Sequence, residues 1–116
     1  MKVIISGGRS FGNYQVLLKA VEDSGFNITE VVSGGATGAD YLGERYAKTT
    51  GKPLKLFRAD WKTLRNAAGP MRNERMAMYA DACIALPGGS GTRDMVKRAT
   101  AHNLKIHLVS PEWFVD

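Results

Sequence analysis

The sequence lacks the features that mark disulfide-rich, secreted and membrane-spanning proteins. Its single cysteine, Cys83, excludes a disulfide framework or a cysteine-based metal site within the chain, and its apolar surroundings predict a buried side chain. No apolar run approaches the roughly 20 residues that span a bilayer, so no membrane partner is expected. The apolar stretch at residues 3–5 is too short for a signal peptide and predicts a first strand. A cytoplasmic location fits these absences.

The signatures of common nucleotide-binding and nucleic-acid-binding proteins are also missing. Neither G-x-G-x-x-G nor G-x-x-x-x-G-K-[ST] occurs, which disfavours a standard dinucleotide or P-loop site. The net charge of +5 favours anionic partners. The basic residues form no long block, however, so nucleic acid is disfavoured as a partner. His102 and His107 have no partner at metal-ligand spacing, and the sequence predicts neither a metal nor a cofactor.

Short β-branched apolar runs alternate with segments of helical periodicity along the chain. Such runs are typical of parallel strands buried on both faces, and right-handed crossovers join them into an open sheet. The sequence predicts one α/β domain over residues 1–116, a Rossmann-like doubly wound parallel sheet with the order 3-2-1-4-5 and helices on both faces. The predicted strands cover residues 2–6, 30–33, 54–57, 82–86 and 105–109, and the predicted helices cover 14–23, 39–50, 70–80 and 92–102, before a short segment at 111–115.

Three of the apolar runs end in a pair of glycines that is followed by a helical segment. Glycine lets main-chain N–H groups approach a ligand, and helix N-termini add donors and partial positive charge. Ligands of open α/β sheets bind outside the carboxyl ends of the strands. The turns therefore predict a site for a phosphorylated molecule, although each pair could serve only a tight turn. Eight of the 13 glycines lie there: Gly7, Gly8, Gly34, Gly35, Gly38, Gly88, Gly89 and Gly91.

Charged residues near these turns are candidates for the rest of the site. Arg72 lies in the first turn of its predicted helix, where a cation opposes the helix dipole, so we expect it to grip a phosphate. Arg9 follows the first glycine pair and is a second phosphate candidate. Asp40 and Asp94 open predicted helices; each would stabilise the helix N-terminus or contact a sugar or base, and Asp94 is a candidate general acid or base.

Trp61 is the aromatic side chain that could take part in such a site. Stacking on a nucleobase and ordinary packing in the core or on the surface both remain open for this residue. Hydroxyl groups interleave with the glycines, and they could bind phosphate oxygens or cap helices. These hydroxyls belong to Ser6, Ser10, Ser33, Thr37, Ser90 and Thr92.

Four segments together resemble the SLOG superfamily, named for the Smf/DprA and Lonely Guy (LOG) proteins, and in particular its small YspA/YpsA-related branch. They are residues 6–11, 33–40, 69–73 and 85–92. The resemblance covers nearly the whole chain and implies a Rossmann-like fold that binds nucleotides or nucleotide-derived molecules at the glycine-rich loops. It implies these ligand-binding residues: Ser6, Gly7, Gly8, Arg9, Ser33, Gly34, Gly35, Ala36, Thr37, Gly38, Asp40, Arg72, Asn73, Pro87, Gly88, Gly89, Ser90, Gly91 and Thr92.

LOG proteins hydrolyse the N-glycosidic bond of nucleoside monophosphates, and their helix arginine falls on Arg72. Their P-G-G-x-G-T-x-x-E motif is similar to the segment that begins at Pro87, but the position of its catalytic Glu is Met95 here. Asp94 is adjacent, yet one residue turns a helix side chain by about 100°. Catalysis by Arg72 and Asp94 is therefore not the first expectation.

Three functions remain open on the sequence alone. The first is a binding module for a nucleotide-derived ligand, acting as a sensor, a carrier or a sequestering protein. The second is a LOG-like phosphoribohydrolase that uses Asp94 as a substitute acid. The third, by similarity to DprA, is a nucleic-acid binder, although no basic stripe with interleaved aromatics is present. LOG relatives commonly form dimers, so a homodimer or higher homo-oligomer is also open.

Overall fold

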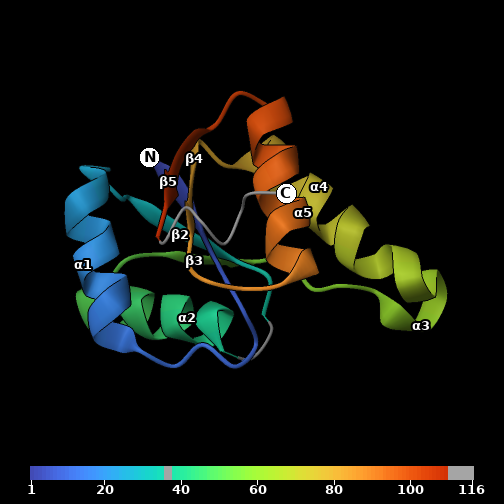
Figure 1. The fold of residues 1–116 in the computed structure, drawn as a ribbon, viewed down its shortest axis with the longest axis horizontal. Coiled ribbons are helices and arrows are strands. Elements are labelled where there is room, and N and C mark those ends of the chain that lie inside the picture. Colours follow the sequence, from blue (N-terminus) through green and yellow to red (C-terminus); the bar gives the residue numbers. More distant parts are fainter. Residues whose placement is uncertain (36–37, 110–116) are drawn as a thin grey trace.

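The computed structural model describes residues 1–35 and 38–109, which form a five-stranded parallel sheet with helices on both faces (Figure 1). The strands are β1 (Lys2–Ser6), β2 (Glu30–Ser33), β3 (Leu54–Leu56), β4 (Ala82–Ala85) and β5 (Lys105–Leu108). The helices are α1 (Tyr14–Ser24), α2 (Ala39–Thr50), α3 (Trp61–Leu64), the short 3-10 helix η1 (Arg65–Ala67), α4 (Ala68–Tyr79) and α5 (Ser90–Ala101). The strand order β3-β2-β1-β4-β5 confirms the predicted Rossmann-like topology.

Alternation along β1 sends neighbouring side chains into two separate apolar cores. Val3 and Ile5 pack in the core that includes residues of α1 and α2, whereas Ile4 packs in the core that includes residues of α4 and α5. This follows from the two-residue period of a strand. Figure 1 shows α1 and α2 apart from α4 and α5, on the other side of the sheet. The sheet is thus buried on both faces, as its short apolar runs predict.

The first helix begins and ends where its sequence signals predict. Asn13 caps α1 by accepting a hydrogen bond from the main-chain N–H of Val16 at 3.3 Å. Gly25 ends the helix in the left-handed region, with φ of 68°, where a residue without Cβ is least strained. No helix among the described residues is long and apolar enough to cross a membrane.

Two helices begin earlier than the sequence predicts. The short helix η1 runs directly into α4, which begins at Ala68 and not at Pro70, so Arg72 lies in the second turn. The prediction that Arg72 lies in a first turn, where a cation opposes the helix dipole, is therefore wrong. Likewise α5 begins at Ser90 and not at Thr92, so Asp94 lies one turn into the helix and does not open it. The predicted segment 111–115 lies outside the described residues.

Cys83 is a fully buried residue of β4, and it provides a test of the fold. Its side chain lies in the core with Ile4 and Met95, and burial raises the pKa of the thiol to about 12. Because the thiolate is the reactive form, we expect the folded protein to resist iodoacetamide at pH 8 and to react only after denaturation in urea. Mass spectrometry of the alkylated chain measures this, and rapid labelling of the folded protein would contradict the burial of β4.

Candidate functional site

A cavity of about 580 Å³ lies at the carboxyl ends of β1, β2 and β4. This is the point where the strand order reverses between β1 and β4, the usual ligand position in open α/β sheets. Its volume falls within the range of about 300–1,000 Å³ that is typical of small-molecule pockets. Twelve sequence-predicted residues line it: Ser6, Gly7, Gly8, Arg9, Gly34, Asp40, Arg72, Asn73, Gly89, Ser90, Gly91 and Thr92. Asp94, the candidate acid, also lines the cavity.

Other predicted residues stand behind the cavity wall. Ser33 is buried; its hydroxyl donates to the carbonyl of Asp40 at 3.3 Å and accepts from the N–H of Gly35 at 3.2 Å. These bonds join the end of β2 to the first turn of α2. Gly35, Gly38, Pro87 and Gly88 are likewise absent from the lining residues. Ala36 and Thr37 lie outside the described residues.

Several glycines let main chains from different loops touch one another. The N–H of Gly8 donates to the carbonyl of Pro87 at 2.9 Å, and the carbonyl of Gly8 accepts from the N–H of Ala39 at 3.2 Å. A Cβ at Gly38 would lie 2.3 Å from the carbonyl oxygen of Arg9, and φ at Gly38 is 73°. These glycines therefore bring the three loops together, and the N–H of Gly8 is already used by the protein.

The first turn of α5 offers main-chain donors in the cavity wall. Gly89 is the N-cap and supplies no side chain, and the first helical hydrogen bond runs from the N–H of Arg93 to the carbonyl of Gly89 at 3.1 Å. The N–H groups of Ser90, Gly91 and Thr92 precede that bond and have no partner within the helix. All three residues line the cavity. Together with the helix dipole, they form a site suited to an anion.

Arg72 brings a cation from α4 to the same cavity. Its Nη1 donates to the carbonyl of Gly34 at 2.8 Å, and a Cβ at Gly34 would lie 2.6 Å from that nitrogen. A Cβ at this position would displace the guanidinium from its place beside the carbonyl. Burial lowers the pKa of Arg72, while nearby Asp40 opposes the shift and Arg9 adds to it. A bound anion would restore the stabilisation that this guanidinium loses on leaving water.

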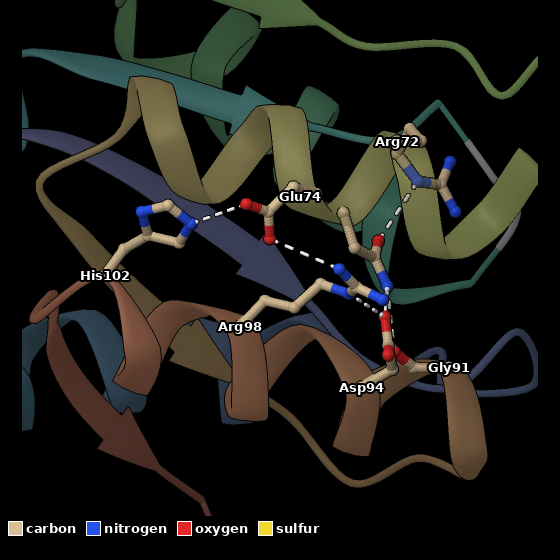
Figure 2. Close-up of polar contacts among 7 residues, drawn as sticks. Arg72, Glu74, Gly91, Asp94, Arg98 and His102 are labelled. Atoms are coloured by element: carbon tan, nitrogen blue, oxygen red, sulfur yellow. Dashed lines mark hydrogen bonds and ion pairs between the residues drawn. The ribbon is translucent and has the colours of Figure 1, made fainter.

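Asn73 joins α4 to the first turns of α5. Its side chain is 7% exposed, and its Oδ1 accepts from Nε of Arg72 at 3.2 Å. Its Nδ2 donates to Oδ2 of Asp94 at 2.9 Å and to the carbonyl of Gly91 at 3.3 Å. The amide therefore fixes the arginine relative to the donors of α5 (Figure 2).

Asp94 belongs to a chain of polar contacts that leads away from the cavity. Its Oδ2 also accepts from Nε of Arg98 at 2.9 Å, and Nη1 of Arg98 donates to Glu74 at 3.2 Å. Glu74 lies 2.7 Å from Nε2 of His102, which is paired as a structural residue (Figure 2). The hydrogen bond with His102 lowers the pKa of Glu74, and that with Asp94 raises the pKa of Arg98. Asp94 is thus held by two donors.

Met95 occupies the position of the LOG catalytic glutamate and faces the wrong way for that role. It is 1% exposed and packs with Ile4, Cys83 and Ala99 in the core beneath α5. A carboxylate at this place would be buried among apolar side chains, at a large desolvation cost. The departure from the LOG motif is therefore part of how the helix packs on the sheet.

We expect the Asn73–Asp94 bond to be measurable as a coupling energy. Asn73→Ala should destabilise the protein by about 1–3 kcal/mol, because it leaves buried polar groups unpaired. In a double-mutant cycle measured by urea denaturation, Asn73→Ala and Asp94→Ala should couple by about 0.5–3 kcal/mol. As the control, Asn73→Ala and Asp23→Ala on distant α1 should add. Additivity in both cycles would contradict the network.

The segment before α4 contributes lining residues that the sequence prediction missed or left open. Asp60 caps α3 by accepting from the N–H of Thr63 at 3.2 Å, and this places Trp61 at the start of α3. Trp61 and Asn66 both line the cavity. An aspartate three residues before a threonine is a weak capping signal, so neither α3 nor Asn66 was predicted.

A comparison with known proteins identifies the family. A family model described as the YspA, cpYpsA-related SLOG family matches residues 1–63. The chain belongs to this family. The Gene 61 protein of Mycobacterium phage D29 is similar to it, with 34% identity over 110 residues that cover 84% of this chain and 87% of that protein. SLOG membership confirms the resemblance inferred from the glycine segments.

The SLOG family match and the cavity overlap only in part. Residues 1–63 include β1, β2, both of their glycine loops and the start of α3. Arg72 in α4 and the first turn of α5 lie after residue 63, so the family model does not cover them. The similarity to the phage protein covers 84% of the chain, so it must extend past residue 63. Because the family model stops before Arg72 and α5, we infer their suitability for an anion from the contacts described above.

Proposed function

We propose that the cavity binds a phosphorylated nucleotide or nucleotide-derived molecule, and that the protein acts as a sensor, a carrier or a sequestering module for it. The observation that carries this proposal is the meeting of Arg72 with the uncapped first turn of α5 in one cavity. A cation and several N–H donors around one space are suited to phosphate oxygens. Membership of the SLOG family is consistent with a nucleotide-related ligand.

The remaining groups of the cavity suit the sugar of a nucleotide. Asp40 and Asp94 both line it, and a carboxylate accepts hydrogen bonds from ribose hydroxyls while repelling phosphate. The two acids therefore favour a ligand whose phosphate lies at α5 and Arg72 and whose hydroxyls lie nearby. An inorganic anion such as sulfate has no hydroxyl group to donate to these carboxylates.

Native mass spectrometry of freshly purified protein tests the proposal. We expect a mass increment that matches a phosphorylated nucleotide-like molecule and that disappears when the protein is denatured. Calorimetric titration with AMP, GMP, CMP, UMP and the corresponding diphosphates follows. Absence of any increment, together with no heat of binding for the whole panel, would overturn the proposal.

Hydrolysis of a nucleoside monophosphate is the second candidate, since Asp94 reaches the cavity wall. The contacts of Asp94 with Asn73 and Arg98 make it a positioning residue in the free protein. Incubation with nucleoside monophosphates and chromatography for free base distinguishes the two functions. Release of base that Asp94→Asn abolishes would establish the hydrolase in place of the binding module.

A further inference from the structure

Trp61 is a large aromatic side chain that remains exposed although it lines the cavity. Its exposed fraction is 50%, and the other large exposed apolar side chains, Tyr41, Leu54, Met71 and Met78, do not line this space. Single exposed apolar residues are ordinary on a protein surface. Position in the wall of the cavity is what distinguishes Trp61 from these residues.

The indole of Trp61 packs against Gly69 of α4. A Cβ at Gly69 would lie 3.3 Å from Cη2 and 3.9 Å from Cζ2 of the ring, closer than ordinary packing at the first atom. Glycine lets the ring lie against the helix main chain, although glycine in a helix costs about 0.5–1 kcal/mol relative to alanine. Asp60, the N-cap of α3, fixes the start of that helix. The ring is therefore placed in advance of any ligand.

Gly69, against which Trp61 packs, lies close to Arg72 on α4. Gly69 and Arg72 are three residues apart on α4, so they share a face and are separated by about 4.5 Å along the axis. Both line the cavity, as does Asn73 on the same side of the helix. The ring of Trp61, packed on α4, and the guanidinium of Arg72 from α4 thus border the same space.

The ring of Trp61 is not engaged by the other aromatic or cationic side chains that the structure describes. The ring centroids of Phe57 and Tyr79 lie 5.4 Å apart. Lys2 lies over Tyr79, Arg75 lies over Phe57, and Lys55 lies over both rings. Tyr14 is covered by Arg45. Trp61 takes part in none of these contacts, so an aromatic ligand could stack on it.

We propose that Trp61 stacks on the base of the bound nucleotide and so gives the cavity its preference for a nucleoside phosphate over a sugar phosphate. This inference rests on the proposed function and adds the class of ligand. The phosphate lies toward Arg72 and α5, the sugar lies near the carboxylates, and the base lies on the indole. Stacking tolerates any base, so the preference is for a base rather than for one particular base.

Calorimetry with ribose 5-phosphate beside AMP, GMP, CMP and UMP tests this assignment. We expect the wild type to bind its best mononucleotide at least about 10-fold more tightly than ribose 5-phosphate. Trp61→Ala should remove most of that ratio while it changes the affinity for ribose 5-phosphate by less than about twofold. Trp61→Phe should keep most of the ratio, and Tyr41→Ala, which removes an exposed aromatic outside the cavity, should keep all of it.

A fluorescence titration gives a readout that does not depend on affinity. The chain has two tryptophans, so Trp113→Phe leaves Trp61 as the single indole. Its emission should be quenched by the mononucleotides and unchanged by ribose 5-phosphate at saturation. A ratio unaffected by Trp61→Ala, or equal loss for both ligand types, would overturn the stacking role while the proposed function stands. No binding of these five probes or of the diphosphates, together with no mass increment in native mass spectrometry, would overturn the proposed function, and this inference with it.

Discussion

Replacing Arg72 with alanine should weaken nucleotide binding by about 1.5–3 kcal/mol, the scale of a hydrogen bond to a charged group. The guanidinium is partly buried, is held by Gly34 and Asn73, and lines the cavity beside the donors of α5. Its loss removes the principal cation from the phosphate position. Isothermal titration calorimetry with the best nucleotide of the panel measures the change.

The matched control is Arg75→Ala, which removes the same charge from the same helix. Arg75 is exposed and its guanidinium lies 5.5 Å from the ring centre of Phe57, away from the cavity lining. We expect its affinity to equal that of the wild type. Arg72→Lys should bind more weakly than the wild type, because an ammonium lacks the two-pronged geometry of the guanidinium. Equal affinities for Arg72→Ala and Arg75→Ala would contradict the assignment.

Replacing Gly88 with alanine should be among the most damaging single changes in the chain. A Cβ there would lie 2.3 Å from Oγ1 of Thr92 and 2.6 Å from the main-chain nitrogen of Gly8. That nitrogen donates to Pro87, so neither loop can move without breaking the bond between them. We expect a loss of at least about 3 kcal/mol, at the upper end for overpacking. Thermal unfolding followed by circular dichroism should show a Tm lower by about 10 °C or more.

Gly91→Ala is the control for this effect. Gly91 lies in the first turn of the same loop–helix unit, and no heavy atom lies within 4 Å of a Cβ built there. Alanine favours the helix, so stability should stay the same or rise by about 0.5–1 kcal/mol. Similar Tm values for Gly88→Ala and Gly91→Ala would show that the loops are not packed main chain against main chain.

The topology and the general position of the site follow from local sequence features. Apolar runs such as Val3–Ile5 mark buried parallel strands, and the crossover rule restricts their order. The glycine pairs mark the carboxyl ends of those strands. Signals such as Asn13 and Gly25 also fix the bounds of α1. These features act over a few residues, so a single sequence contains them.

The details that depend on tertiary packing could not be predicted in this way. The 3-10 helix before α4 includes Arg65 with φ of 50°. Positive φ is uncommon for residues other than glycine, so the sequence does not predict it at an arginine. That turn moved the start of α4, and with it the position of Arg72. The contact of Arg72 with Gly34 joins residues 38 apart, and no spacing rule connects them. The same holds for the bond between Asn73 and Asp94.

Main-chain and side-chain NMR of the ¹⁵N-labelled protein during titration with the best nucleotide tests the central claim most directly. The N–H signals of Ser90, Gly91 and Thr92 and the Nε–H signal of Arg72 should shift together with one dissociation constant. Gly25 and Gly51, at the C-terminal ends of α1 and α2, should not move. Shifts confined to one of the two helices, or centred away from both, would contradict a shared anion site between α4 and α5.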